Sequence, residues 1–289
     1  MSSYVRHFDW TKRLPYLAVG SCFFAILGCS IFGPADSSTS FTSHRPLLPP
    51  IQATPEAIQL EVFFLERPAE DHLMTTAVWK DVDQIGALSS ETREMLTANG
   101  FRIGQVSSNL PPSVQKLLGM SAEIPSNESE YARPIMGRHQ YLAPGVETEI
   151  PTGIQHEKCE FVIRDNSRSK KLEFEQVSCV LRMKANRLQD GWVRVDFQPE
   201  IHHGAPLMRP TPSNDGWTFR GGQNIDIRHS QRFSVSMNVG ESLLISSTSD
   251  EDGSLGDRFF CHDDRGSKKQ RVLVVRIIDS GHDTAGSTK

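Results

Sequence analysis

The sequence predicts an α+β fold: a small α/β N-terminal module over residues 58–120, followed by a β-rich antiparallel C-terminal domain over residues 139–279. Two observations lead to this prediction. In the first stretch, runs of apolar residues with strand spacing alternate with runs that have helix spacing. From His139 onward, clusters of Gly, Pro and Asx residues separate short runs of Val, Ile and Phe, which is typical of antiparallel β-structure. The chain has 289 residues, enough for two compact units.

Residues 1–28 are predicted to be a signal peptide. Arg6, Lys12 and Arg13 form a positive region, and residues 14–28 then carry no charge. A transmembrane helix needs about 20 apolar residues, so this run is short for one. The alternative is an uncleaved anchor that extends to Phe32. In both cases the positive charges stay in the cytoplasm and the rest of the chain is exported.

The charge-free run ends in Ile26-Leu27-Gly28-Cys29, which resembles the lipobox of bacterial lipoprotein precursors. This resemblance implies that Cys29 is lipidated on its sulfur and becomes the N-terminus of the mature protein. Ser30, the next residue, resembles the choice found in lipoproteins sorted to the outer membrane. The implied location is the cell envelope, as an outer-membrane lipoprotein that faces the periplasm, because three fatty chains anchor a protein stably.

Residues 29–57 are rich in Ser, Thr and Pro and are predicted to form a flexible tether. Residues 58–65 alternate and then become continuously apolar, as in a mostly buried strand. Helices are expected at residues 73–82 and 89–99, and the second has Ser89 as its N-cap.

A second strand is expected at residues 101–106, and a short helix from Pro111 or Pro112 to Leu118 completes the module. Residues 121–138 lack a clear period and are predicted to be a linker.

The β-rich domain is expected to contain six strands. Turn residues at 165–169 and 189–191 predict hairpins between the first three. The polar residues 280–289 are predicted to be disordered. The expected strands are residues 159–164, 172–184, 192–201, 224–239, 242–247 and 272–278.

Three segments of this domain resemble the C-terminal β domain of bacterial secretins. The first is Val193-Arg194-Val195-Asp196-Phe197-Gln198-Pro199-Glu200-Ile201, where secretins have a comparable Pro-Glu-Ile strand. The second, residues 233–245, contains Gly240-Glu241 before an apolar strand, and the third is the hydrophobic strand at residues 272–278. The resemblance covers about a third of the chain and implies a shared β fold. In place of the secretin gate region, the chain has the acidic loop at residues 249–254.

Three cysteines follow the signal region. Cys159 and Cys179 flank a predicted hairpin almost symmetrically, and an exported protein meets oxidising conditions, so a disulfide between them is a candidate. Cys261 is then left over. Its expected role is that of a small half-buried apolar side chain.

Metal, cofactor and catalytic motifs are absent from the sequence. The weak candidates for metal ligands are His202, His203, His262 and Asp264. Neighbouring residues on a strand point to opposite faces, which argues against one ion between His202 and His203. No catalytic residue and no cofactor is therefore assigned, and Trp217, in a Gly-rich loop, is the best candidate for a contact residue.

The leading functional hypothesis is a non-enzymatic, membrane-anchored envelope lipoprotein that binds or scaffolds another envelope protein. A net charge of -4 and a pI near 6.2 argue against nucleic acid as a partner. Two alternatives remain. One is an exported hydrolase that acts on an envelope polymer, with a site built from residues 202–209 and 250–264; the other is a secretin-like assembly subunit.

Overall fold

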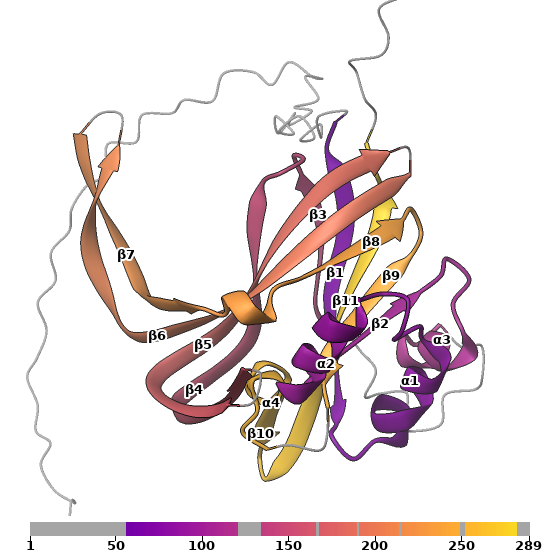
Figure 1. The fold of residues 1–289 in the computed structure, drawn as a ribbon, viewed down its shortest axis with the longest axis horizontal. Helices are drawn as coiled ribbons and strands as arrows, with labels where there is room; N and C mark the ends of the chain where they lie inside the picture. The colour runs from indigo at the N-terminus through magenta and orange to yellow at the C-terminus, as the bar shows by residue number, and fades with distance from the viewer. Residues whose placement is uncertain are drawn as a thin grey trace, which may run out of the picture. The chain divides into compact units, whose positions relative to one another are not determined.

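The computed structural model describes residues 56–120, 134–165, 168–189, 191–213, 216–248 and 252–281 (Figure 1). The predicted signal peptide, Cys29 and most of the predicted tether lie outside them, as do most of the predicted linker and tail. None of the described helices is both long enough and apolar enough to span a bilayer.

The predicted α+β fold class is wrong, because the protein is mostly β. Of the described residues, 63% are in strands and 17% are helical. The strands form two antiparallel sheets, here called sheet A and sheet B. The segment predicted as an α/β module has no sheet of its own, since both of its strands belong to sheet A.

Sheet A joins the beginning and the end of the described chain. Its strand order is β2-β9-β11-β1-β3, and β10 adds to β11. The predicted first strand is β1, which pairs along its length with β11 on one side and with β3 on the other. Its strands are β1 (Ile58–Pro68), β2 (Phe101–Val106), β3 (Pro134–Leu142), β9 (Ser242–Ser247), β10 (Cys261–Asp264) and β11 (Ser267–Asp279).

Sheet B consists of long strands that follow one another as hairpins. The order is β4-β5-β6-β7, and β8 pairs with the free side of β6. Both predicted hairpin turns are confirmed, since Asp165 pairs with Arg168 and Gln189 with Trp192. The strands are β4 (Glu147–Asp165), β5 (Arg168–Gln189), β6 (Trp192–Ser213), β7 (Gly216–Ile227) and β8 (Phe233–Asn238).

The single strand predicted at residues 224–239 is wrong. The chain there ends β7, makes the 3₁₀ turn η3 (His229–Gln231) and starts β8. Gln231, at the end of this turn, is buried. This break sends β8 back across β6.

The elements η1, α1 and α3 cover one face of sheet A, whereas α2 and α4 contribute side chains to the core between the two sheets (Figure 1). Ser89 caps α2 as predicted, with its hydroxyl accepting from the Thr92 amide at 3.3 Å. The helix predicted at residues 73–82 is a π turn followed by one α-helical turn. The elements are η1 (Leu73–Ala77), α1 (Val78–Asp81), α2 (Ser90–Ala98), α3 (Pro112–Leu117) and α4 (Leu255–Phe260).

Two apolar cores hold these layers together. The larger lies between the sheets and includes Leu60 and Val275 from sheet A and Leu181 and Val195 from sheet B. The smaller lies between the opposite face of sheet A and η1, α1 and α3, where Leu117 is fully buried. Strand β9 and residues 272–275 of β11 are buried on both faces, which explains their continuous apolar runs.

The β6–β7 hairpin extends beyond the rest of sheet B (Figure 1). The pairing of β6 with β5 ends at His202, and its pairing with β8 covers only residues 192–197. From Leu207 to Ser213, β6 pairs with β7 alone. We call residues 204–222 the arm.

Candidate functional site

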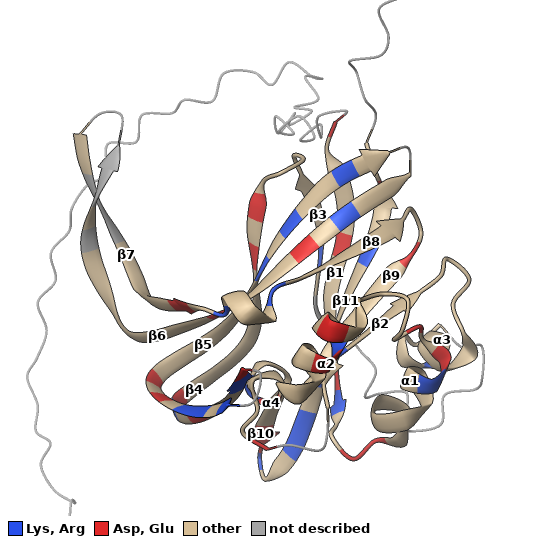
Figure 2. Ribbon diagram, viewed as in Figure 1, with Lys and Arg blue, Asp and Glu red and all other residues tan. Residues whose placement is uncertain are grey.

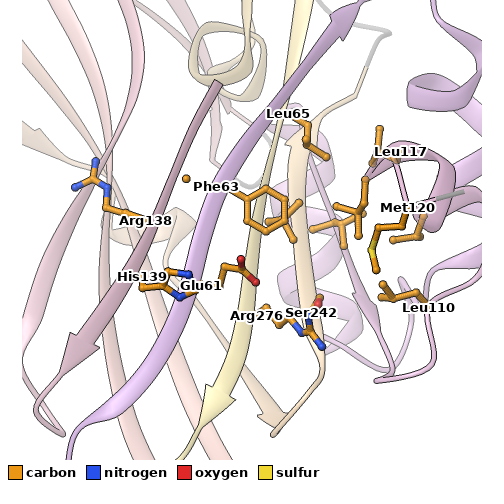
Figure 3. A pocket seen from close by; sticks show the side chains of 15 residues that line it. Glu61, Phe63, Leu65, Leu110, Leu117, Met120, Arg138, His139, Ser242 and Arg276 are labelled. Atoms are coloured by element: carbon orange, nitrogen blue, oxygen red, sulfur yellow. The ribbon is translucent and has the colours of Figure 1, made fainter. Parts of the chain in front are cut away.

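A pocket of about 420 Å³ lies on the helix-covered face of sheet A, beside α3 (Figure 3). Pockets of roughly 300–1,000 Å³ that combine apolar walls with a few polar groups are typical of small-molecule sites. This one has both features.

The floor and roof of the pocket are apolar. Across the floor, Phe63 on β1 is the cross-strand neighbour of Gly137 on β3 and of Val274 on β11. The roof comes from α3, with Leu117, and from Leu110 before it. The floor opens here because Gly137 has no side chain to fill it.

One row of polar residues runs across the sheet at the end of this floor. The register places His139 beside Glu61, Glu61 beside Arg276, and Arg276 beside Ser242. Figure 3 shows these four side chains at one side of the pocket, while Arg138 points away from it.

In this row, Arg276 has a hydrogen-bond donor without a partner among the described residues. Its Nε is buried and has no hydrogen-bond partner within the described part of the chain. Unsatisfied buried donors are rare in folded proteins and mark places where a ligand or water completes the bonding. Sequence reasoning missed this pocket, since most of its residues come from four strands and α3, which are far apart along the chain.

The candidate His202 is held in a buried ion cluster. Arg182 donates to both oxygens of Glu200, at 2.6 and 3.0 Å, and His202 Nε2 lies 3.0 Å from Glu200 Oε2. Burial raises the pKa of Glu200, but the bonds from Arg182 and His202 outweigh it and the pKa lies below its ordinary value. The Glu200 side chain is 1% exposed, so this cluster is a structural fastening between β5 and β6.

The other candidate metal ligands lie apart from His202. His203 packs its ring against Phe174 at 4.3 Å between centroids, and burial lowers its pKa. His262 is on β10 in sheet A, 3.5 Å from Glu66, and Asp264 ends the same strand. The structure does not bring the four candidates together, and no group of three potential ligands exists among the described residues.

The three cysteines among the described residues, Cys159, Cys179 and Cys261, are buried free thiols. In the β4–β5 register Cys159 faces Phe174, and in the β5–β6 register Cys179 faces Ile201, so the two are not cross-strand neighbours. Burial raises the pKa of Cys159 to about 11 and that of Cys261 to about 12. Such thiols stay protonated at neutral pH and are poor nucleophiles.

The residues assigned to the hydrolase alternative are not in facing loops. Residues 202–209 belong to β6, and residues 252–264 form a turn, α4 and β10. No observation on the described residues supports the hydrolase alternative.

The arm exposes large apolar side chains. Trp217 is 72% exposed, Met208 67% and Leu207 54%. Figure 2 shows charged residues along β4 and β5, and the arm includes Arg209 and Arg220, which are cross-strand neighbours. The sequence singled out Trp217, but it did not predict that β6 would run through Pro210 and Pro212.

No family model, no curated protein and no solved structure matches this chain.

Proposed function

We propose that this protein is a non-enzymatic, membrane-anchored envelope protein that binds another envelope protein through its arm. The observation that carries the proposal is the exposure of Leu207, Met208 and Trp217 on a ribbon that pairs with no further strand among the described residues. The anchoring rests on the signal-peptide and lipobox patterns of residues 1–29.

A separate arm of this kind costs the protein stability. A two-stranded ribbon alone is marginally stable in water. Clustered exposed apolar side chains also favour association, and Trp and Met are enriched at protein interfaces. Met208 and Trp217 lie on the same face of the ribbon, since residue 208 and residue 212, which pairs with Trp217, are four positions apart on β6; Leu207 lies on the opposite face. Burial of one such side chain contributes about 1.5–3 kcal/mol, so Met208 and Trp217 together can form an interface hot spot.

Self-assembly, as in the secretin-like alternative, is the second candidate. It would use the outer edges of the arm to pair strands between copies. Pro210 and Pro212 have the same orientation along β6, and each lacks an N–H. Because β6 remains paired with β7, we infer that these nitrogens face the outer edge, where they block strand addition. Contacts through side chains are therefore favoured over continuous strand pairing.

The test compares arm variants with a matched surface variant. Full-length protein is expressed with Met208→Ser and Trp217→Ser together, or with Ile85→Ser as the control, since Ile85 is 74% exposed but lies outside the arm. Complexes extracted gently from membranes are sized by sedimentation. We expect the arm variant to lose a heavier complex that the wild type and the control retain.

Two results would contradict the proposal. The wild type could sediment as a single chain, or the arm variant could keep the full complex. Co-expression of two differently tagged copies separates the candidates, because self-assembly predicts that one tag recovers the other and a distinct partner does not.

A further inference from the structure

We propose that the pocket beside α3 binds a single-chain amphiphile with a neutral, hydroxyl-bearing head, such as a monoacylglycerol. The hydrocarbon chain occupies the apolar floor between Phe63 and Leu117, and the head meets the row of Glu61, Arg276 and Ser242. This site is separate from the arm and does not depend on the function proposed above.

The apolar part of the pocket selects a hydrocarbon chain over a peptide. Its walls are the side chains of Phe63, Leu65, Leu110, Leu117, Leu244 and Val274. These side chains offer no donor or acceptor, so a peptide would bury unpaired N–H and C=O groups, each at a cost of about 1–3 kcal/mol. A chain of methylenes leaves no such group behind.

The polar row selects the head. The buried Nε of Arg276 lacks an acceptor within the described chain, and Glu61, its neighbour across the strands, forms no ion pair that the described residues show. One positive and one negative side chain side by side leave little net charge. A hydroxyl group accepts from Arg276 and donates to Glu61, whereas a carboxylate meets repulsion from Glu61.

The first experiment fills the pocket. A Cβ on Gly137 would lie 3.5 Å from the Phe63 Cβ, an ordinary contact, so Gly137→Leu adds a side chain over the floor without backbone strain. The control is Gly222→Leu, because nothing lies within 4 Å of a Cβ there. Binding of decanoyl glycerol to the full-length protein is measured by titration calorimetry below the micelle concentration.

We expect Gly137→Leu to weaken binding by at least about tenfold while Gly222→Leu leaves it unchanged. Thermal unfolding of both variants verifies that they are folded. Absence of binding to the wild type, or equal binding by the Gly137→Leu variant, overturns the proposal. So does binding that appears only after residues 121–133 are replaced by a Gly-Ser linker, which would make the protein's own chain the occupant.

The second experiment tests the head. The wild type is expected to bind decanoyl glycerol about tenfold more tightly than decanoate at neutral pH. In Glu61→Gln the decanoate affinity should rise by about tenfold, because the like charge is gone. Glu91→Gln, on the exposed face of α2, is the matched control. If decanoate binds the wild type as well as the glycerol ester does, the assignment of a neutral head is wrong.

Discussion

Replacement of Arg182 by Met isolates the contribution of the Glu200 cluster to stability. The Glu200 side chain is 1% exposed and depends on Arg182 and His202 for its bonds. Removal of one partner from a buried pair costs about 3–5 kcal/mol when the remaining charge has no other partner. Because His202 remains and Arg182 is partly exposed, we expect about 2–3 kcal/mol at neutral pH.

The same variant should reverse the pH dependence. In the wild type the pKa of Glu200 is lowered, so the ionised carboxylate stabilises the fold at pH values above its ordinary pKa. This contribution is lost as the pH falls through the folded-state pKa. Without Arg182, burial is the largest remaining influence and raises the pKa of Glu200. Ionisation of the buried carboxyl then destabilises the folded variant as the pH rises. The loss of unfolding free energy caused by Arg182→Met should therefore shrink from neutral pH toward acid.

The assay is urea unfolding of the wild type and the variants at several pH values. Arg194→Met is the control, because Arg194 is half exposed and its buried partner Asp196 keeps hydrogen bonds from Asn186 and Ser234. We expect this control to cost less than Arg182→Met. A cost below about 1 kcal/mol for Arg182→Met, or a cost that grows toward acid, would refute the reasoning.

Three further predictions concern the anchor, the thiols and the packing of α4. Intact mass of membrane-extracted protein should show a species that begins at a diacylglycerol-modified Cys29, and a signal peptidase II inhibitor should abolish it; unlipidated full-length protein would instead show the uncleaved anchor. Cys159, Cys179 and Cys261 are buried with raised pKa values, so in the native protein at pH 8 they should resist maleimide and should react once denatured, as mass spectrometry can count. In Gly256→Ala a Cβ would fall 2.0 Å from the Gly100 carbonyl oxygen, which should cost about 3 kcal/mol in urea unfolding, while Gly222→Ala should cost less than about 1 kcal/mol.

Local patterns in the sequence predicted local structure well. The strands β2 and β9 and the N-cap of α2 lie where apolar spacing and capping residues placed them. What failed was the assignment of strands to sheets. The pairing of β1 with β11 joins residues about 200 positions apart, and periodicity does not indicate which strands meet.

The missed elements have physical causes. The edge strand β3 contains Gly137-Arg138-His139, a polar run without alternation, because only part of one face is covered. The arm contains Pro210 and Pro212, which normally end a strand but are tolerated where their nitrogens face no partner. The pocket could not be predicted from the sequence, because its floor depends on the register of four strands.

The position of β1 and β11 also sets the order in which the protein can fold. These two central strands of sheet A come first and last in the described chain, with all of sheet B between them. Sheet A therefore stays incomplete until β11 has emerged, and such non-local pairing makes folding slow. This delay agrees with the export proposed above, because a domain that closes early cannot thread through a secretion channel.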